Sequence, residues 1–183
     1  MTRREALTRA AAAGLAPLAT PPAAHALRLD ELRRLEREAV GAAVRAEQVA
    51  KVAFEAIANG GALDDRTTVT MRILLDHASE HAELLEKQFK EVYGDEPPLA
   101  PRRTEIPGLV EDGTSDQRHF LRLATRIEEQ AIAAHIGAVR RTHKGQLLKL
   151  IAGVAGSDAQ ALVLLRQLLH RPAVPSAFER GRA

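Results

Sequence analysis

The sequence predicts an all-α fold, a four-helix bundle made of two antiparallel helical hairpins that a long crossover loop joins. Ala and Leu dominate its 183 residues, whereas strand-forming and aromatic residues are scarce, with one Tyr, four Phe and no Trp. Glycine and proline cluster at a few places and leave four long stretches free to be helical. The middle cluster, residues 94–114, is long enough to be a crossover connection.

Each predicted helix has recognisable end signals. The first ends at Gly60-Gly61, and Asp64-Asp65 then supplies capping side chains for the second. Thr114-Ser115-Asp116 caps the third, and Lys144-Gly145 marks a break before the fourth, which ends ahead of Pro172. The helices are therefore expected at residues 29–59, 67–93, 116–142 and 146–170.

The connection over residues 94–114 contains four prolines and three glycines, so we expect it to form no long helix. Its 21 residues could reach ~70 Å if extended at ~3.3 Å each. A helix of ~27 residues is only ~40 Å long. The chain can therefore cross the whole bundle here, whereas the short links elsewhere make each helix pair an antiparallel hairpin.

The first 26 residues have the pattern of an export signal. Arg3-Arg4 precede a weakly apolar run over residues 10–19, and the segment ends in the small-x-small sequence Ala24-His25-Ala26. The arginine pair resembles the twin-arginine type. We expect an exported protein, periplasmic, extracellular or in the cell envelope; a disordered Ala-rich N-terminus is the alternative. The expected division is a signal at 1–26, a bundle at 27–178 and a tail at 179–183.

Composition and charge exclude several classes of function. Residues 27–183 carry 23 basic and 23 acidic side chains, so no polybasic face is expected for nucleic acid or anionic lipid. The scarcity of aromatic residues also argues against base stacking. The absence of Cys excludes disulfides and thiolate metal sites. The apolar run near the N-terminus is shorter than the ~20 residues of a membrane span, so no transmembrane span is expected. A homodimer is compatible with the sequence, and a protein partner is not identified.

The two predicted hairpins resemble each other in sequence. Arg45-Ala46-Glu47-Gln48 matches Arg126-Ile127-Glu128-Glu129 at an offset of 81 residues, and residues 78–85 match residues 158–165 at an offset of 80. Because the two offsets differ by only one residue, a single alignment of the two hairpins contains both matches. Equivalent positions of the two hairpins are therefore expected at similar depths in the bundle.

Every predicted helix places an ionisable residue within its inward-facing apolar stripe, which recurs every three or four residues. Three buried carboxylates would repel one another and lose hydration, and one imidazolium could neutralise only one of them. A bound cation, raised carboxylate pKa values or access of water would offset this cost. Carboxylate and imidazole are suitable ligands for iron, manganese or zinc. The candidate metal ligands are Glu47, His81, Glu128 and Asp158.

Other interpretations of these positions remain open. Glu47 and Glu128 could lie at the edges of their stripes and pair with Arg45, Arg126 or solvent, which would leave a metal-free bundle. His135 is seven residues past Glu128, ~10 Å along the helix axis, so it is expected to be a supporting or core polar residue. The remaining histidines of the bundle are expected to face solvent: His77, His119, His143 and His170.

The chain resembles exported bacterial proteins with a ferritin-like domain over nearly all of residues 30–178. The resemblance includes the crossover bundle and a Glu in the middle of the first and third helices. It also includes the Ala-Ile-Ala-Ala run after Glu128-Glu129, the run over residues 156–162, and the ending Pro175-Ser176-Ala177-Phe178.

The resemblance implies a metal site that has lost part of its ligand set. Metal-binding members take one Glu from each of two helices and a Glu-x-x-His pair from each of the other two. Glu47 and Glu128 correspond to the single glutamates. The second-helix pair falls on Ala78 and His81, and the fourth-helix pair falls on Asp158 and Ala161. Four of the six positions keep a donor, which suits one metal ion better than two.

These observations predict an exported ferritin-like bundle with a degenerate di-metal site, acting as a non-catalytic metal-binding or structural protein. The expected cofactor is one iron, manganese or zinc ion, or none. One alternative is a mononuclear or weak dinuclear iron or manganese oxidoreductase acting on oxygen or peroxide. Another is an envelope-associated protein-interaction module. No catalytic residue is assigned from the sequence.

Overall fold

The computed structural model describes residues 22–109 and 116–173, with side chains from residue 28 onward. The chain divides into two units, residues 1–34 and 35–183. The described part of the first unit is helical and carries exposed ion pairs such as Arg34–Glu31. The described ranges contain no strand, which confirms the all-α class. The elements are α2 (Pro22–Asn59), α3 (Asp65–Tyr93), the 3₁₀ helix η1 (Arg103–Glu105), α4 (Gln117–Val139) and α5 (Gly145–Leu168).

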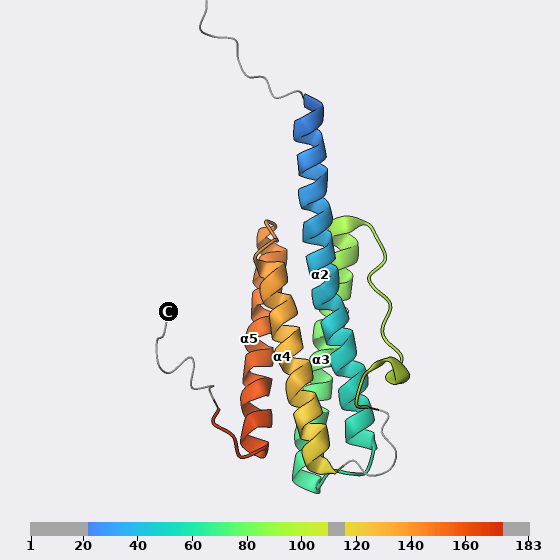
Figure 1. Ribbon diagram of the computed structural model, residues 1–183, viewed down its shortest axis with the longest axis vertical. Helices are drawn as coiled ribbons and strands as arrows, with labels where there is room; N and C mark the ends of the chain where they lie inside the picture. Colours follow the sequence, from blue (N-terminus) through green and yellow to red (C-terminus); the bar gives the residue numbers. More distant parts are fainter. Residues whose placement is uncertain (1–21, 110–115, 174–183) are drawn as a thin grey trace, which may run out of the picture. The chain divides into compact units, whose positions relative to one another are not determined.

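Within residues 35–183 the four helices lie side by side as two hairpins, α2 with α3 and α4 with α5 (Figure 1). The connection that leaves the end of α3 runs back along the bundle towards the start of α4 (Figure 1). It lies against α2, since the Gln48 side-chain amide donates to the carbonyl of Pro98 at 2.7 Å. The expected four-helix bundle with a long crossover is therefore confirmed.

The helix ends follow the predicted capping chemistry. Asp64 accepts from the backbone N–H of Thr67 at 2.7 Å and begins α3, and Asp116 accepts from His119 at 2.8 Å and begins α4. Gly94 ends α3 in the left-handed conformation, with φ of 71°, where a residue without a Cβ is favoured. Gln117 exchanges two hydrogen bonds with Asp64, of 2.7 and 3.0 Å, and so ties the α2–α3 turn to the start of α4.

The observed bounds differ from the expected ones mainly at two ends. Helix α4 stops at Val139 rather than at Thr142, because the chain tightens into a turn in which Arg141 N–H bonds to the carbonyl of Ala138, three residues back. Helix α2 begins at Pro22 rather than at Leu29, where proline is well suited to the first helical turn. The predicted export signal stays a prediction, since residues 1–21 lie outside the described part of the chain.

The hydrophobic core of the bundle consists of two clusters at different levels along the helices. One cluster includes Phe54 and Leu165, and the other includes Val40 and Ile151. In each helix the residues of one cluster precede those of the other, and a polar interval separates them. Because each fully buried large side chain contributes ~1.5–3 kcal/mol, the two clusters can hold a costly polar layer between them.

One helix of the described ranges, α5, is long and apolar enough to cross a membrane by length and composition alone. The core helix of a bundle passes the same test. The inward face of α5 supplies Leu147, Ile151 and Leu165 to the two core clusters.

Candidate metal centre

The polar interval between the two apolar clusters contains acidic and imidazole side chains from all four helices. Helix α2 supplies Glu47, α3 supplies His81, α4 supplies Glu128 and His135, and α5 supplies Asp158. Glu47 is 1% exposed, Glu128 and Asp158 are 4% exposed each, and His135 is fully buried. His81 is half-buried at the edge of the group. The structure therefore places all four sequence-predicted residues inside the bundle at one level.

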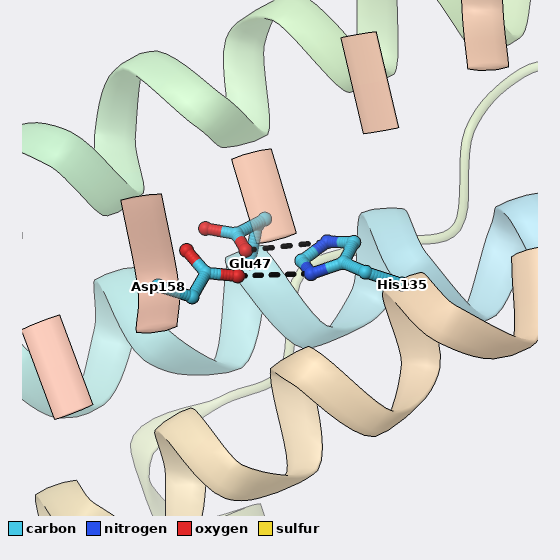
Figure 2. A group of neighbouring side chains, drawn as sticks. All are labelled: Glu47, His135 and Asp158. Atoms are coloured by element: carbon cyan, nitrogen blue, oxygen red, sulfur yellow. Dashed lines mark ion pairs between the residues drawn. The ribbon is translucent and has the colours of Figure 1, made fainter. Parts of the chain in front are cut away.

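Two carboxylates and two imidazoles are in direct contact. His135 Nε2 lies 3.4 Å from Glu47 Oε1, and His135 Nδ1 lies 2.9 Å from Asp158 Oδ2. Figure 2 shows the two carboxylates next to each other against this ring. On the other side, His81 Nδ1 lies 3.5 Å from Glu47 Oε2 and 3.4 Å from Asp158 Oδ1. Each carboxylate thus lies between two imidazoles, and each imidazole touches both hairpins.

These contacts are close, but the atoms do not satisfy one another's hydrogen-bonding capacity. Five buried atoms of the group have no hydrogen-bond partner, although nearly all buried polar atoms in proteins do have one. One ligand atom from each of Glu47, His135 and Asp158 lies within 4.8 Å of the others. Buried nitrogen and oxygen atoms that face one another without hydrogen bonds are candidates for metal ligands. The unpartnered atoms are Glu47 Oε1, His81 Nδ1, His135 Nδ1, His135 Nε2 and Asp158 Oδ2.

Electrostatics show how the group neutralises itself without a metal ion. Burial raises the pKa of Glu47 above its usual range, although contact with His81 opposes this effect. For Asp158, burial is outweighed by contacts with His135 and His81, which hold the pKa of this carboxyl below its usual range. Burial disfavours the charge on His81, but contacts with Asp158 and Glu47 prevail and raise its pKa to about 9. At neutral pH, His81 therefore carries a proton that a metal ion would have to displace.

The carboxyl group of Glu128 is strongly perturbed by its surroundings. Burial, followed by the charges of Asp158 and Glu47, raises the pKa of Glu128 to about 9. It is therefore protonated at neutral pH in the metal-free protein. Glu128 and His81 both lie outside the three-residue group that could hold an ion, but His81 contacts both of its carboxylates, whereas Glu128 is coupled to them by charge. The structure supports Glu128 as a neighbour of the centre more directly than as one of its ligands.

The sequence-based expectation for His135, a supporting or core polar residue, missed its direct contact with the two carboxylates. The expectation rested on its axial distance from Glu128. Long side chains of a helix lean towards its N-terminus and cover the preceding turn, so the ring reaches back to the level of Glu47 and Asp158. One feature of the sequence could have predicted this contact: His135 lies seven residues after Glu128, and residues seven apart share a helix face. His135 and Glu128 accordingly both point into the core.

The other sequence-based interpretations can be compared with the structure. Ala78 and Ala161 are buried, so these positions face the interior but supply no donor. Glu47 and Glu128 do not lie at the edges of their stripes, and the guanidinium of Arg45 instead contacts Leu99 and Glu105 in the crossover. Three of the four histidines expected at the surface are exposed, whereas His119 is half-buried with Nε2 3.1 Å from the carbonyl of Gly108.

Comparison with known proteins supports the fold. A solved structure of a conserved hypothetical protein from Mycobacterium tuberculosis has a similar fold, with a TM-score of 0.67 and 12% identity, covering 79% of this chain and 96% of that chain. No curated protein matches the sequence significantly. The family described as "Ferritin-like domain" matches residues 32–171, which include α2 from residue 32 onward, the other three helices and every residue of the centre. The chain therefore belongs to the ferritin-like domain family.

Proposed function

We propose that the protein binds a single transition-metal ion, iron, manganese or zinc, in the middle of its bundle. The proposed ligands are Glu47, His81, His135 and Asp158, and Glu128 lies beside them. One observation carries the proposal: buried nitrogen and oxygen atoms of these residues face one another across the two hairpins without hydrogen-bond partners. A divalent ion would satisfy these atoms and offset the carboxylate charge at the same time.

The donor set fits this class of metal. Imidazole suits zinc, iron and copper, and carboxylates suit manganese and iron as well. Two imidazoles with two carboxylates give four donors, the usual number in a closed zinc site. The proposed ligand set thus contains two imidazoles, one more than the sequence alone suggested. A bound ion would supply Lewis acidity or redox chemistry there.

A structural or storage role without catalysis is the function that we favour. The carboxylates are buried between two apolar clusters, and the side chain of His81, at 15% exposure, is the most accessible of the group. No residue of the centre lines any of the three described cavities. A two-metal reaction needs ions held ~3.5–4 Å apart, and the alanines at positions 78 and 161 remove donors for a second ion.

A mononuclear oxidoreductase acting on oxygen or peroxide is the second candidate, and one observation favours it. His81 and His135 together with one carboxylate make up the two-histidine, one-carboxylate set of non-haem iron enzymes. The partial exposure of His81 would give a small oxidant a route to that set. The N-terminal pattern supports the further proposal that the protein is exported.

The test begins with the full-length protein purified without chelator, dialysed and analysed for metal per chain. The proposal expects about one ion per chain, which Glu47→Gln should abolish. The matched control is Glu55→Gln, since Glu55 is an exposed residue of the same helix. No metal in the purified protein and no saturable binding of Fe(II), Mn(II) or Zn(II) on titration would overturn the proposal. Peroxide or oxygen consumption by the loaded protein would favour the oxidoreductase.

A further inference from the structure

A groove on the outside of the bundle lies between α2, α4 and the crossover connection. We propose that this groove binds an amphiphile with one anionic headgroup, such as the carboxylate of a medium-chain fatty acid. The groove encloses about 480 Å³, which is within the ~300–1,000 Å³ typical of small-molecule sites. It lies outside the metal centre, and the proposal does not depend on metal binding.

The walls of the groove combine polar and apolar atoms, and the apolar part comes from three segments. Ile106 and Pro107 line it from the crossover, and Leu123 and Ile127 line it from α4. Val49 adds a half-buried side chain from α2. An alkyl chain placed here would cover carbon surface on three separate segments, and burying each of its CH₂ groups is favourable.

The rim of the groove has an excess of positive charge. Arg45 and Arg126 both line it, whereas Glu105 is its single acidic residue. Glu105 is already shared, because its carboxylate lies 3.7 Å from Arg45 and 4.0 Å from Arg102. An anion at the rim would therefore meet complementary charge. Guanidinium groups also match carboxylate and phosphate geometry with two parallel N–H donors.

Arg126 is the better placed of the two arginines to take the headgroup. Its side chain is exposed, and a terminal nitrogen lies 3.8 Å from the position that a Cβ on Gly108 would occupy, at the groove wall. Arg45 is engaged by the carbonyl of Leu99 and by Glu105, so it holds the crossover and contributes charge. Among the described side chains, none forms an ion pair or hydrogen bond with Arg126.

The internal repeat explains why two arginines converge here. Arg45 precedes Glu47 by two residues, and Arg126 precedes Glu128 by two. Two residues along an α-helix correspond to a rotation of about 200°, so each arginine faces away from the glutamate that follows it. The same duplicated motif thus places acids inside the bundle and guanidinium groups on the groove outside.

Calorimetric titration of the full-length protein with decanoate, below its micelle concentration, tests the proposal. Decyl phosphate, decanol and acetate are the comparison ligands. Saturable binding of decanoate or decyl phosphate, with decanol and acetate at least tenfold weaker, is the expected result, and the better anion identifies the headgroup. Because a charge-assisted hydrogen bond is lost, Arg126→Gln should weaken binding about tenfold or more. Arg140→Gln, an exposed change just after the end of α4, should have no effect.

Two further variants separate the apolar and charged parts of the site. Val49→Phe should reduce binding by filling the groove, and Glu105→Gln should tighten it by removing the competing carboxylate. Glu47→Gln should bind decanoate like the wild type, which keeps this test independent of the metal centre. Equal binding of decanol and decanoate, unchanged affinity in Arg126→Gln, or no saturable binding at millimolar ligand would each overturn the proposal.

Discussion

His135 and Asp158 come from opposite helices of one hairpin, and His135 Nδ1 lies 2.9 Å from Asp158 Oδ2, yet neither atom has a hydrogen-bond partner. A histidine that served only to satisfy a buried acid would direct an N–H at it. Here the ring also turns its second nitrogen to Glu47, at 3.4 Å. This relationship makes His135 the residue whose replacement is most informative.

The first prediction concerns His135→Gln. The change removes an imidazole that touches both buried carboxylates, so the free energy of unfolding of the metal-free protein should fall by ~1–3 kcal/mol, the cost of leaving a buried polar group without its neighbour. Metal retention after dialysis should be lost. Urea unfolding and elemental analysis measure the two effects. The control is His143→Gln, which alters an exposed histidine; similar behaviour of the two variants would contradict the role of His135.

The second prediction concerns the pH dependence of stability and Glu128. Its pKa is about 9 in the folded protein, against 4.5 for an ordinary glutamate. Between these values the unfolded chain holds fewer protons at this position than the folded chain, so the wild type loses stability as the pH rises. Glu128→Gln does not titrate, and its stability relative to wild type should therefore increase from pH 5 to pH 9.

Urea unfolding at pH 5, 7 and 9, in the presence of chelator, measures this difference. Each pH unit within the window is worth at most ~1.4 kcal/mol, and below pH 4.5 the two proteins should be alike. Glu129→Gln, which changes the exposed neighbour, should follow the wild type at every pH. A constant difference between Glu128→Gln and wild type would show that Glu128 is not protonated inside the bundle.

The third prediction concerns competition between protons and metal. His81 has a pKa of about 9 in the metal-free protein, so binding must expel its proton. Metal affinity should rise as the pH increases from 6 to 9, and calorimetry in buffers of different ionisation enthalpy should detect released protons. Affinity that is independent of pH would argue against His81 as a ligand.

The fourth prediction concerns stabilisation by the ion. A ligand at 100 times its Kd adds ~2.7 kcal/mol to the stability of the folded state, which corresponds to roughly 5–10 °C in Tm for a chain of this size. Removing the metal by chelation should lower Tm by this amount in the wild type and in Glu55→Gln. Glu47→Gln should show no response, and a full response in that variant would exclude Glu47 from the site.

The fifth prediction concerns the clamp between Asp64 and Gln117. Asp64→Ala removes the cap of α3 and the side-chain hydrogen bond from Gln117, so it should lower the urea midpoint more than Asp64→Asn, which retains a capping oxygen. Combining Asp64→Ala with Gln117→Ala should cost less than the sum of the two single changes, because they share one interaction. Strict additivity would show that the clamp contributes nothing.

Much of this architecture follows from local rules that the sequence displays. The acidic caps Asp64 and Asp116 determine where α3 and α4 begin, and Gly94 determines where α3 ends, because each satisfies backbone groups within one turn. The burial of Glu47 and Asp158 follows from helical periodicity, which fixes the face on which a residue lies. The start of α2 at Pro22 was not anticipated, because an Ala-rich stretch suits both a helix and a signal sequence.

The site itself was harder to predict than the fold. Helical periodicity predicts how deeply a residue is buried and on which face of the helix it lies, but not how far its side chain extends along the helix. The contact between His135 and Glu47 depends on that extension. The contact of Arg45 with the carbonyl of Leu99 depends on the path of an irregular connection. Nothing in the spacing of residues along a helix encodes such a path.

The placement of the centre has a consequence for how quickly an ion could leave. Glu47 and His81 belong to one hairpin, and His135 and Asp158 belong to the other. Complete release would therefore require the two hairpins to separate at mid-length. Exchange of the bound ion with solvent should be slow, and its rate should equal the rate at which the bundle opens there. The dissociation rate of a bound ion would then serve as a clock for that opening, and amide protons of α2 and α5 at this level should exchange with solvent on the same timescale.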